Sequence, residues 1–239
     1  MLIILALVAG SELWTQYHLS QWREPVVVNL FAINADRDSA SERYLQHLPI
    51  RNFRSIKLFL NREASHYSIR APAFAIRYRG MVSALPPQLP ERGGVFDNIL
   101  WSLKFRGWSL YHRWKTSVAV ADVNLYILYY NTRTNQRLRH SVGLKQGTIG
   151  QINAFAENRY QGSNNVVIAH ELLHTLGASD QYDQNNLPIY PSGYAAPYQK
   201  PLHPQSKAEI MGGRIPRNPG QADIPTSLKG GVNRALYGC

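Results

Sequence analysis

Residues 166–180 read VVIAHELLHTLGASD and contain the pattern H-E-x-x-H at positions 170–174. On a helix, His170 and His174 lie one turn apart on one face, where both imidazoles can reach the same ion. The apolar residues around them predict a buried helix, in which polar side chains are costly unless they are paired or bind a metal. This stretch therefore predicts a core helix with a metal site. Histidines satisfied by ordinary hydrogen bonds are the alternative.

A third ligand is expected just beyond this helix. Gly177 stands where a left-handed residue can end the helix and reverse the chain, and Asp180 follows shortly after it. Two histidines and one carboxylate leave the fourth position of a zinc ion open, as in catalytic sites. The rival ligands downstream are Asp183, His203 and Glu209. The spacing and the nearby glycine favour Asp180.

Glu171 lies beside the first histidine, where its carboxylate can contact a metal-activated water instead of the metal. A structural zinc site has no need of such a glutamate, and it usually takes four protein ligands rich in cysteine. The chain has a single cysteine, Cys239. We therefore predict one catalytic Zn2+ held by His170, His174 and Asp180, with Glu171 as the general base.

At this point the chain resembles a known family. The pattern His170-Glu171-x-x-His174-x-x-Gly177-x-x-Asp180 is similar to the long zinc-binding consensus of the metzincin metallopeptidases, and closest to the snapalysin-like variants with Asp as third ligand. Residues 208–213 (AEIMGG) resemble the metzincin Met-turn, which would place Met211 in a hydrophobic base beneath the metal. Residues 151–156 are similar to the edge strand along which these enzymes align substrate. The resemblance implies a zinc-dependent endopeptidase with a zincin-like fold.

A protein or peptide substrate would then extend along this edge near Ala154, bound mainly through its backbone. The candidates to stabilise the oxyanion are four tyrosines, Tyr182, Tyr190, Tyr194 and Tyr198. The alternative for each tyrosine is pocket lining or simple surface exposure. The alternative function for the whole chain is a catalytically inactive, zinc-stabilised binding protein that acts at the envelope or at a membrane surface.

The chain is strongly basic, with 26 Lys and Arg against 15 Asp and Glu and a net charge of +11. The excess is concentrated between Lys104 and Lys145, where Asp122 is the only acidic residue. Such a basic face serves solubility or attraction to an anionic membrane surface. Because no nucleic-acid motif accompanies it, no nucleic-acid partner is expected.

Residues 1–24 are expected to be a signal or membrane-anchor segment. Leu2 to Ala9 is an uninterrupted apolar run, followed by Gly10 and Ser11, as in a short secretory signal. A spanning helix needs roughly 20 apolar residues, more than this run provides. We therefore expect export, to the periplasm or the medium, with anchoring at the membrane as a variant. A buried N-terminal strand or helix is the alternative.

Strand patterns alternate with helical patterns along the rest of the chain. Strands are expected at 25–31, 73–82, 122–130, 141–144 and 151–156, and helices at 39–48, 53–63, 97–114 and from 166 onward. Ser39 or Ser41 is expected to cap the first helix, and Asp97 the third. On the third helix, core packing is expected of the residues at three- and four-residue steps, with membrane docking as the alternative: Ile99, Leu100, Leu103, Trp108 and Tyr111.

This order predicts an α/β (α+β) fold, with a mixed twisted sheet, a backing helix and an active-site helix. The early alternation predicts parallel pairing, and the short later strands predict an antiparallel edge. We expect one metallopeptidase domain over 25–239. Residues 25–177 would form its sheet and zinc helix, and residues 178–239 a small irregular C-terminal subdomain that contains the Met-turn.

Overall fold

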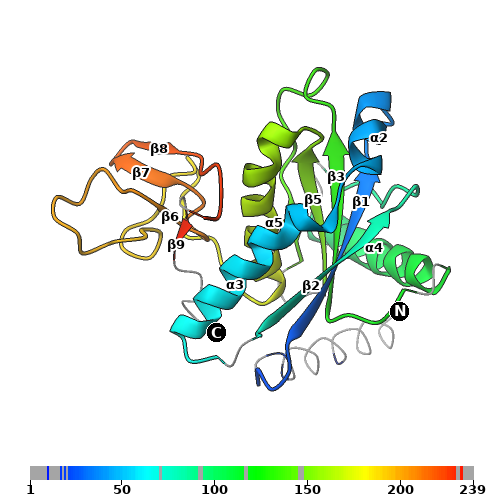
Figure 1. Cartoon of the computed structure of the whole chain (residues 1–239), viewed down its shortest axis with the longest axis horizontal. Coiled ribbons are helices and arrows are strands. Elements are labelled where there is room, and N and C mark those ends of the chain that lie inside the picture. The colour runs from blue at the N-terminus through cyan, green and yellow to red at the C-terminus, as the bar shows by residue number, and fades with distance from the viewer. Residues whose placement is uncertain are drawn as a thin grey trace.

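A five-stranded sheet forms the centre of the computed structural model, which describes Gly10, Tyr17, Leu19 and residues 21–69, 72–90, 94–115, 118–144, 148–229 and 232–233 (Figure 1). Its strands are β1 (Val26–Asn34), β2 (Phe74–Met81), β3 (Val123–Tyr130), β4 (Val142–Gly143) and β5 (Ile149–Phe155). The order is β2-β1-β3-β5-β4, with β4 antiparallel to β5 and all other neighbours parallel. The predicted mixed sheet with an antiparallel edge is therefore confirmed. Most of the expected segment 1–24 lies outside the described residues.

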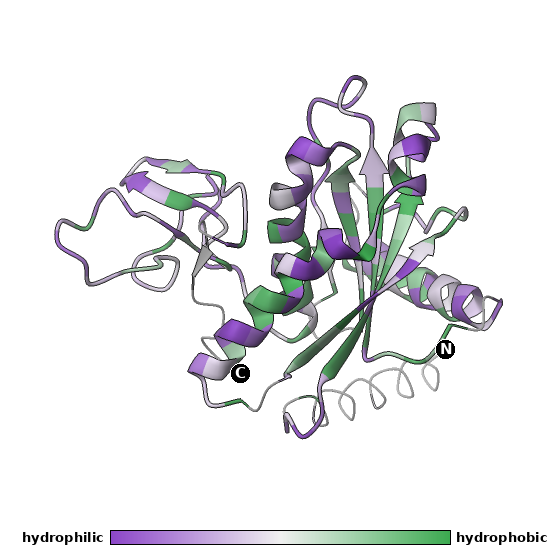
Figure 2. Ribbon diagram, in the orientation of Figure 1, coloured by the Kyte–Doolittle hydropathy of each residue, from purple (hydrophilic) through white to green (hydrophobic). Residues whose placement is uncertain are grey.

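Helices cover both faces of this sheet. On one face α2 (Ser39–Gln46), α3 (Arg54–His66) and α5 (Gln161–Thr175) enclose a core with alternate strand residues such as Leu125 and Ile152. On the other face α4 (Val95–Lys115) packs over the intervening residues, such as Phe31 and Tyr126. Because β1 and β3 are buried on both faces, they are apolar along most of their length, as Figure 2 shows. Short 3-10 turns, Ile50–Phe53 and Asn158–Tyr160, precede α3 and α5.

Several helix starts differ from the predictions because polar side chains form them. α5 begins at Gln161 instead of Val166, since Asn164 and Asn165 are buried and bond to backbone groups of neighbouring segments. Asp38, not Ser39 or Ser41, caps α2: its carboxylate accepts from the Ala40 N–H at 2.7 Å. Asp97 lies inside the first turn of α4 and accepts from the Gly94 N–H at 2.9 Å.

The core positions of α4 were predicted wrongly in part. The buried residues of this helix are Trp101, Phe105 and Ser109, and Trp108 packs partly against them. Three residues that were expected in the core are exposed: Ile99, Leu100 and Tyr111. The helix has apolar residues on opposite sides, so periodicity alone could not show which side packs. No helix in the described part of the chain is long and apolar enough to cross a membrane.

The substrate-aligning edge was assigned to the wrong strand. β5 has β3 on one side and β4 on the other, so β4 is the outermost strand here. Beyond β4, the outer side of β5 is also covered: the Asn153 N–H donates to the Ser141 hydroxyl, and the Asn164 amide bonds to both backbone groups of Phe155. No substrate can therefore pair with β5 near Ala154 without displacing these groups.

The C-terminal part lies beside α5, away from the sheet (Figure 1). It contains two small sheets, formed by β6 (Ala208–Glu209) with β9 (Val232–Asn233) and by β7 (Ile215–Asn218) with β8 (Gln221–Asp223). The other described residues of this segment, up to 229, form no helix or strand, as expected. The core nevertheless extends into it, because Ile210 and Met211 are buried in the same cluster as Leu172 and Leu173 of α5.

Candidate metal centre

Three side chains meet at the C-terminal end of α5. The Nε2 atoms of His170 and His174 lie 3.0 Å apart, and Oδ1 of Asp180 is 3.2 Å from the first and 3.1 Å from the second. The two imidazole rings are nearly perpendicular, at 87°. These three atoms form an almost equilateral triangle, and within the described residues this is the one group of three that could hold a metal ion.

The end of α5 brings Asp180 to the histidines. The Gly177 N–H donates to the His174 carbonyl at 3.0 Å, and the Ala178 N–H donates to the Leu173 carbonyl at 3.0 Å. These two bonds and the φ of +103° at Gly177 define a Schellman ending with a left-handed glycine, as the sequence predicted. The chain turns back over the last turn of the helix, so Asp180 reaches both imidazoles.

Two backbone carbonyls orient the imidazoles. Nδ1 of His170 lies 2.9 Å from the Ile210 carbonyl, and Nδ1 of His174 lies 2.9 Å from the Ala178 carbonyl. A carbonyl can only accept, so each Nδ1 carries the proton and each Nε2 is left to face the other members of the triangle. This arrangement is typical of metal-ligating histidines, whose second nitrogen is held by an acceptor. Sequence reasoning did not identify either carbonyl.

Within the triangle, the carboxylate and the imidazoles stabilise each other's charged forms. Burial alone would raise the pKa of Asp180, but His170 and His174, which in their protonated form donate from Nε2 to this carboxylate, outweigh it and hold this pKa well below its usual range. Burial would lower the pKa of His174, yet its bonds to Asp180 and to the Ala178 carbonyl raise it. In the metal-free protein the carboxylate is therefore ionised and attracts positive charge to the triangle.

Glu171 is buried beside the triangle and is not part of it. Burial raises the pKa of its carboxyl, although His170, the Gly143 N–H and His174 partly offset this effect. Its Oε2 accepts a short hydrogen bond from the Gly143 N–H of β4. The carboxylate thus lies between the histidines and the outermost strand of the sheet, where it can exchange a proton with a bound molecule.

Gly143 is required at this contact because α5 approaches its backbone closely. A Cβ placed on Gly143 would lie 2.3 Å from the Glu171 carbonyl oxygen and 3.0 Å from Cβ of His174. We expect Gly143→Ala to lower the free energy of unfolding by about 1–3 kcal/mol, because β4 must move away from α5. Urea denaturation of the metal-free protein measures this change.

Gly107→Ala is the matched control for this substitution. Gly107 lies within α4, and a Cβ there would meet no atom within 4 Å. Alanine should therefore stabilise the helix by up to about 1 kcal/mol. Equal effects of the two substitutions would contradict the close approach of β4 to α5.

The four tyrosines occupy different surroundings. The Tyr182 ring stacks near His170 with centroids 6.2 Å apart, and burial and the neighbouring Asp180 carboxylate raise the pKa of its hydroxyl. Tyr194 bonds to Nε2 of His203 at 3.1 Å, and its ring packs against Tyr190. Tyr198 is exposed. Of the four, Tyr182 alone lines the cavity beside the triangle.

The rival ligands have structural partners of their own. Oδ1 of Asp183 accepts from the N–H groups of Asn185 and Leu187, which closes a turn. His203 bonds to Tyr194. Glu209 is buried, and its carboxylate accepts from the Gly212 N–H at 2.6 Å. None of the three belongs to the metal-binding group.

A cavity of about 290 Å³ opens beside the triangle. His170 and Glu171 form part of one wall, and the turn after Met211 forms another through Gly212, Gly213 and Arg214. Leu138 to Ser141 close a third side. The cavity therefore reaches from His170 to both the sheet edge and the C-terminal part.

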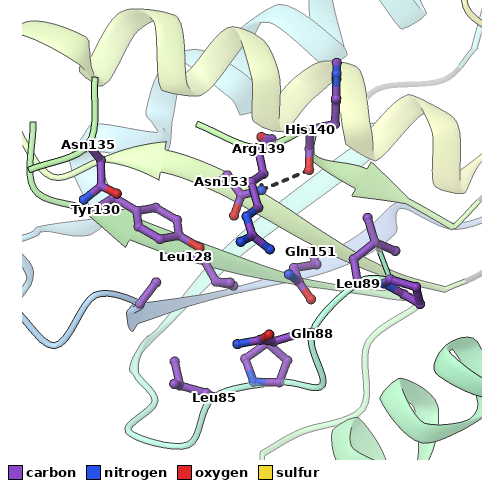
Figure 3. Close-up of a pocket in the computed structure, with 13 residues that line it drawn as sticks. Leu85, Gln88, Leu89, Leu128, Tyr130, Asn135, Arg139, His140, Gln151 and Asn153 are labelled. Carbon is purple, nitrogen blue, oxygen red and sulfur yellow. Dashed lines mark hydrogen bonds between the residues drawn. The ribbon is translucent and has the colours of Figure 1, made fainter. Parts of the chain in front are cut away.

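A second cavity of about 580 Å³ lies on the α4 side of the sheet (Figure 3). It shares Arg139, His140 and Asn153 with the first cavity. The Asn153 amide donates to the carbonyls of Arg139 and His140, at 3.2 and 3.0 Å, and so holds this segment against β5. Asn153 therefore supports the wall that separates the two cavities.

Comparisons with known proteins provide no family for the chain: no protein-family model matches it, and no curated protein matches it.

Proposed function

We propose that this chain is a zinc-dependent endopeptidase of the metzincin type, with aspartate as the third metal ligand. One observation carries the proposal. A triangle of two Nε2 atoms and one carboxylate oxygen, with sides of 3.0–3.2 Å, lies beside a buried glutamate that is not part of it. Three ligands with a separate carboxylate are the arrangement of a catalytic site, and a structural site has no use for the fourth group.

The donor set fits zinc. Tetrahedral zinc with bonds of about 2.0–2.2 Å to nitrogen and oxygen needs ligand atoms about 3.3 Å apart. The triangle is only slightly smaller than this. Imidazole nitrogen and carboxylate oxygen are ordinary zinc ligands, and the Ile210 and Ala178 carbonyls already fix the tautomer that leaves both Nε2 atoms available. His170, His174 and Asp180 would therefore hold the ion with little rearrangement.

In the proposed hydrolysis, the zinc ion and the residues of the chain have different roles. When bound, zinc makes a water molecule more acidic and polarises the carbonyl of a peptide bond. Glu171 would take the proton from the water and later deliver it to the leaving amine. Its burial favours the first transfer, because a carboxylate with a raised pKa is a stronger base. Tyr182, which lines the same cavity, is the candidate to donate a hydrogen bond to the oxyanion.

The substrate would bind as an extended strand along β4 and not along β5. β4 is the outermost strand, and its Gly143 N–H faces Glu171. A peptide that pairs with this segment would bring its scissile bond past Glu171 and the triangle. The cavity that Tyr182 and Arg214 line would receive one of its side chains. Met211, buried in the turn whose Ile210 carbonyl holds His170, would act as the hydrophobic base of the site.

The direct test is a metal and activity assay on the purified protein. We expect about one zinc per chain, cleavage of a fluorogenic peptide library, loss of cleavage with a chelator, and recovery when zinc is restored. A protein that retains zinc and cleaves no peptide or protein substrate would contradict the proposal.

Zinc affinity is expected to fall as the pH is lowered. A protonated imidazole cannot bind the ion, and the pKa of His174 is raised, so protons compete from a higher pH than for an ordinary histidine. Affinity should rise by up to about tenfold per pH unit for each ligand that must lose a proton, from about pH 5 until the histidines are neutral. Competition with a chelator of known affinity measures it. An affinity that does not change over this range would exclude histidine ligands.

A further inference from the structure

α4 has two apolar sides, and only one of them packs on the sheet. Trp101 and Phe105 face the core, with Ser109 hydrogen-bonded to Tyr126. The opposite side of the helix has another apolar row, which is exposed to solvent: Val95, Phe96, Ile99, Leu100, Leu110, Tyr111 and Trp114. These residues form two groups, at 95–100 and 110–114, on the same side of the helix, with the partly buried Leu103 between them, so they form one interrupted stripe. We call it the α4 stripe.

The α4 stripe is strongly exposed at both of its ends. Phe96 is 88% exposed and Trp114 is 79% exposed, one near each end of α4. Single exposed apolar residues are common on proteins, but several that share one side of a helix mark an interaction site. Large aromatic residues at both ends, with leucines between them, are typical of a surface that enters an apolar phase.

Basic residues border the α4 stripe. Lys104 and Lys115 are exposed along one side of it on the helical wheel, and the partly exposed Arg106 and Arg113 lie near the other side. Asp97 is the only acidic residue within the helix. Long basic side chains can keep their charge in the headgroup region while their aliphatic stems follow the apolar stripe. On edge strand β2, Arg77 and Arg79 are also exposed.

We infer that α4 docks the protein onto the surface of an anionic lipid bilayer, with the α4 stripe inserted at the level of the headgroups and the helix parallel to the membrane plane. Apolar side chains supply the insertion, and the surrounding lysines and arginines bind the anionic headgroups. A second copy of this chain is a poorer occupant. Two α4 stripes face to face would bring their basic borders together, with one aspartate per copy to offset them.

The orientation leaves the metal centre in solution. α4 covers one face of the sheet, whereas α5, with His170 and His174, covers the other (Figure 1). A protein docked through α4 would therefore present the Asp180 side to the aqueous phase. The docking does not depend on the proposed peptidase activity, so each can be tested without the other.

Vesicle co-sedimentation with the whole protein tests the inference. We expect binding to vesicles of phosphatidylcholine mixed with phosphatidylglycerol to be at least about tenfold tighter than to phosphatidylcholine alone, and to weaken with salt. Phe96→Ser with Trp114→Ser should reduce binding by more than about tenfold, since both large apolar groups are lost. Lys104→Gln and Arg113→Gln should each reduce it about fivefold. His170→Ala should leave it unchanged.

A matched pair of exposed apolar residues elsewhere provides the control. Tyr198→Ser with Ile224→Ser removes similar exposed side chains from the C-terminal part and should not change vesicle binding. Circular dichroism and urea denaturation verify that both double variants are folded. The inference is overturned if wild type does not bind anionic vesicles, if the α4 variant binds as tightly as the control variant, or if sedimentation shows a dimer that the α4 variant abolishes.

Discussion

Glu171→Gln is expected to lower kcat/KM for peptide hydrolysis by about 10²–10⁴-fold while zinc stays bound. Glutamine keeps the shape of the side chain and can no longer accept a proton from water. The carboxylate is not part of the metal triangle, so zinc affinity should change far less than activity. Activity on a fluorogenic peptide and zinc content of the same preparation measure the two quantities separately.

Glu63→Gln is the control for this substitution. Glu63 is also a buried glutamate on a helix, but it pairs with Arg62 and His66 on α3. Its replacement should affect stability and leave kcat/KM for the remaining folded protein nearly unchanged. If Glu171→Gln had no more effect than Glu63→Gln, Glu171 could not be the general base. If neither protein cleaved any substrate although both bound zinc, the inactive, zinc-stabilised binding protein would be the better account.

A large loss of zinc affinity is expected when Asp180, the proposed third ligand, is replaced. Asp180→Asn should weaken zinc binding by at least about 100-fold, because outer partners of metal ligands already contribute 10–100-fold and Asp180 is proposed as a direct ligand. The loss of charge also removes the attraction that Asp180 provides for the ion. At a free zinc concentration a hundred times the Kd, zinc should raise the free energy of unfolding of the wild type by about 2.7 kcal/mol. At the same zinc concentration the free energy of unfolding of the variant should rise much less.

Asp183→Asn separates the direct ligand from a nearby aspartate. Asp183 is three residues further along and closes a turn through the N–H groups of Asn185 and Leu187. Its replacement should lower stability somewhat without changing zinc affinity. Competition titration with a chelator measures both variants. Equal losses of zinc affinity would show that Asp180 contributes through the loop and not through the metal.

The candidate metal site could be predicted from the sequence because its geometry is largely local. The four-residue spacing of His170 and His174 places both rings on one face of any helix. The left-handed ending at Gly177 returns Asp180 to the same place, through contacts within a few residues. The order of strands and helices was equally visible, since periodicity depends on residues close in sequence.

Only the tertiary structure showed which groups support these ligands. The Ile210 carbonyl, which holds His170, is 40 residues away in the chain. The Gly143 N–H that reaches Glu171 comes from a two-residue strand on another element. Neither contact has a pattern in the sequence, because each depends on how distant segments pack.

Only the fold determined which strand edges and helix sides are packed and which are exposed to solvent. The sequence by itself determined the type and order of the main elements and the spacing of the three residues of the candidate metal site, through helical and strand geometry. It could not assign the edge of the sheet to β4, nor show that Phe96 and Trp114 of α4 face solvent while Trp101 faces the core. Periodicity tells which residues share a side of a helix, but only the packing of distant segments determines what that side meets.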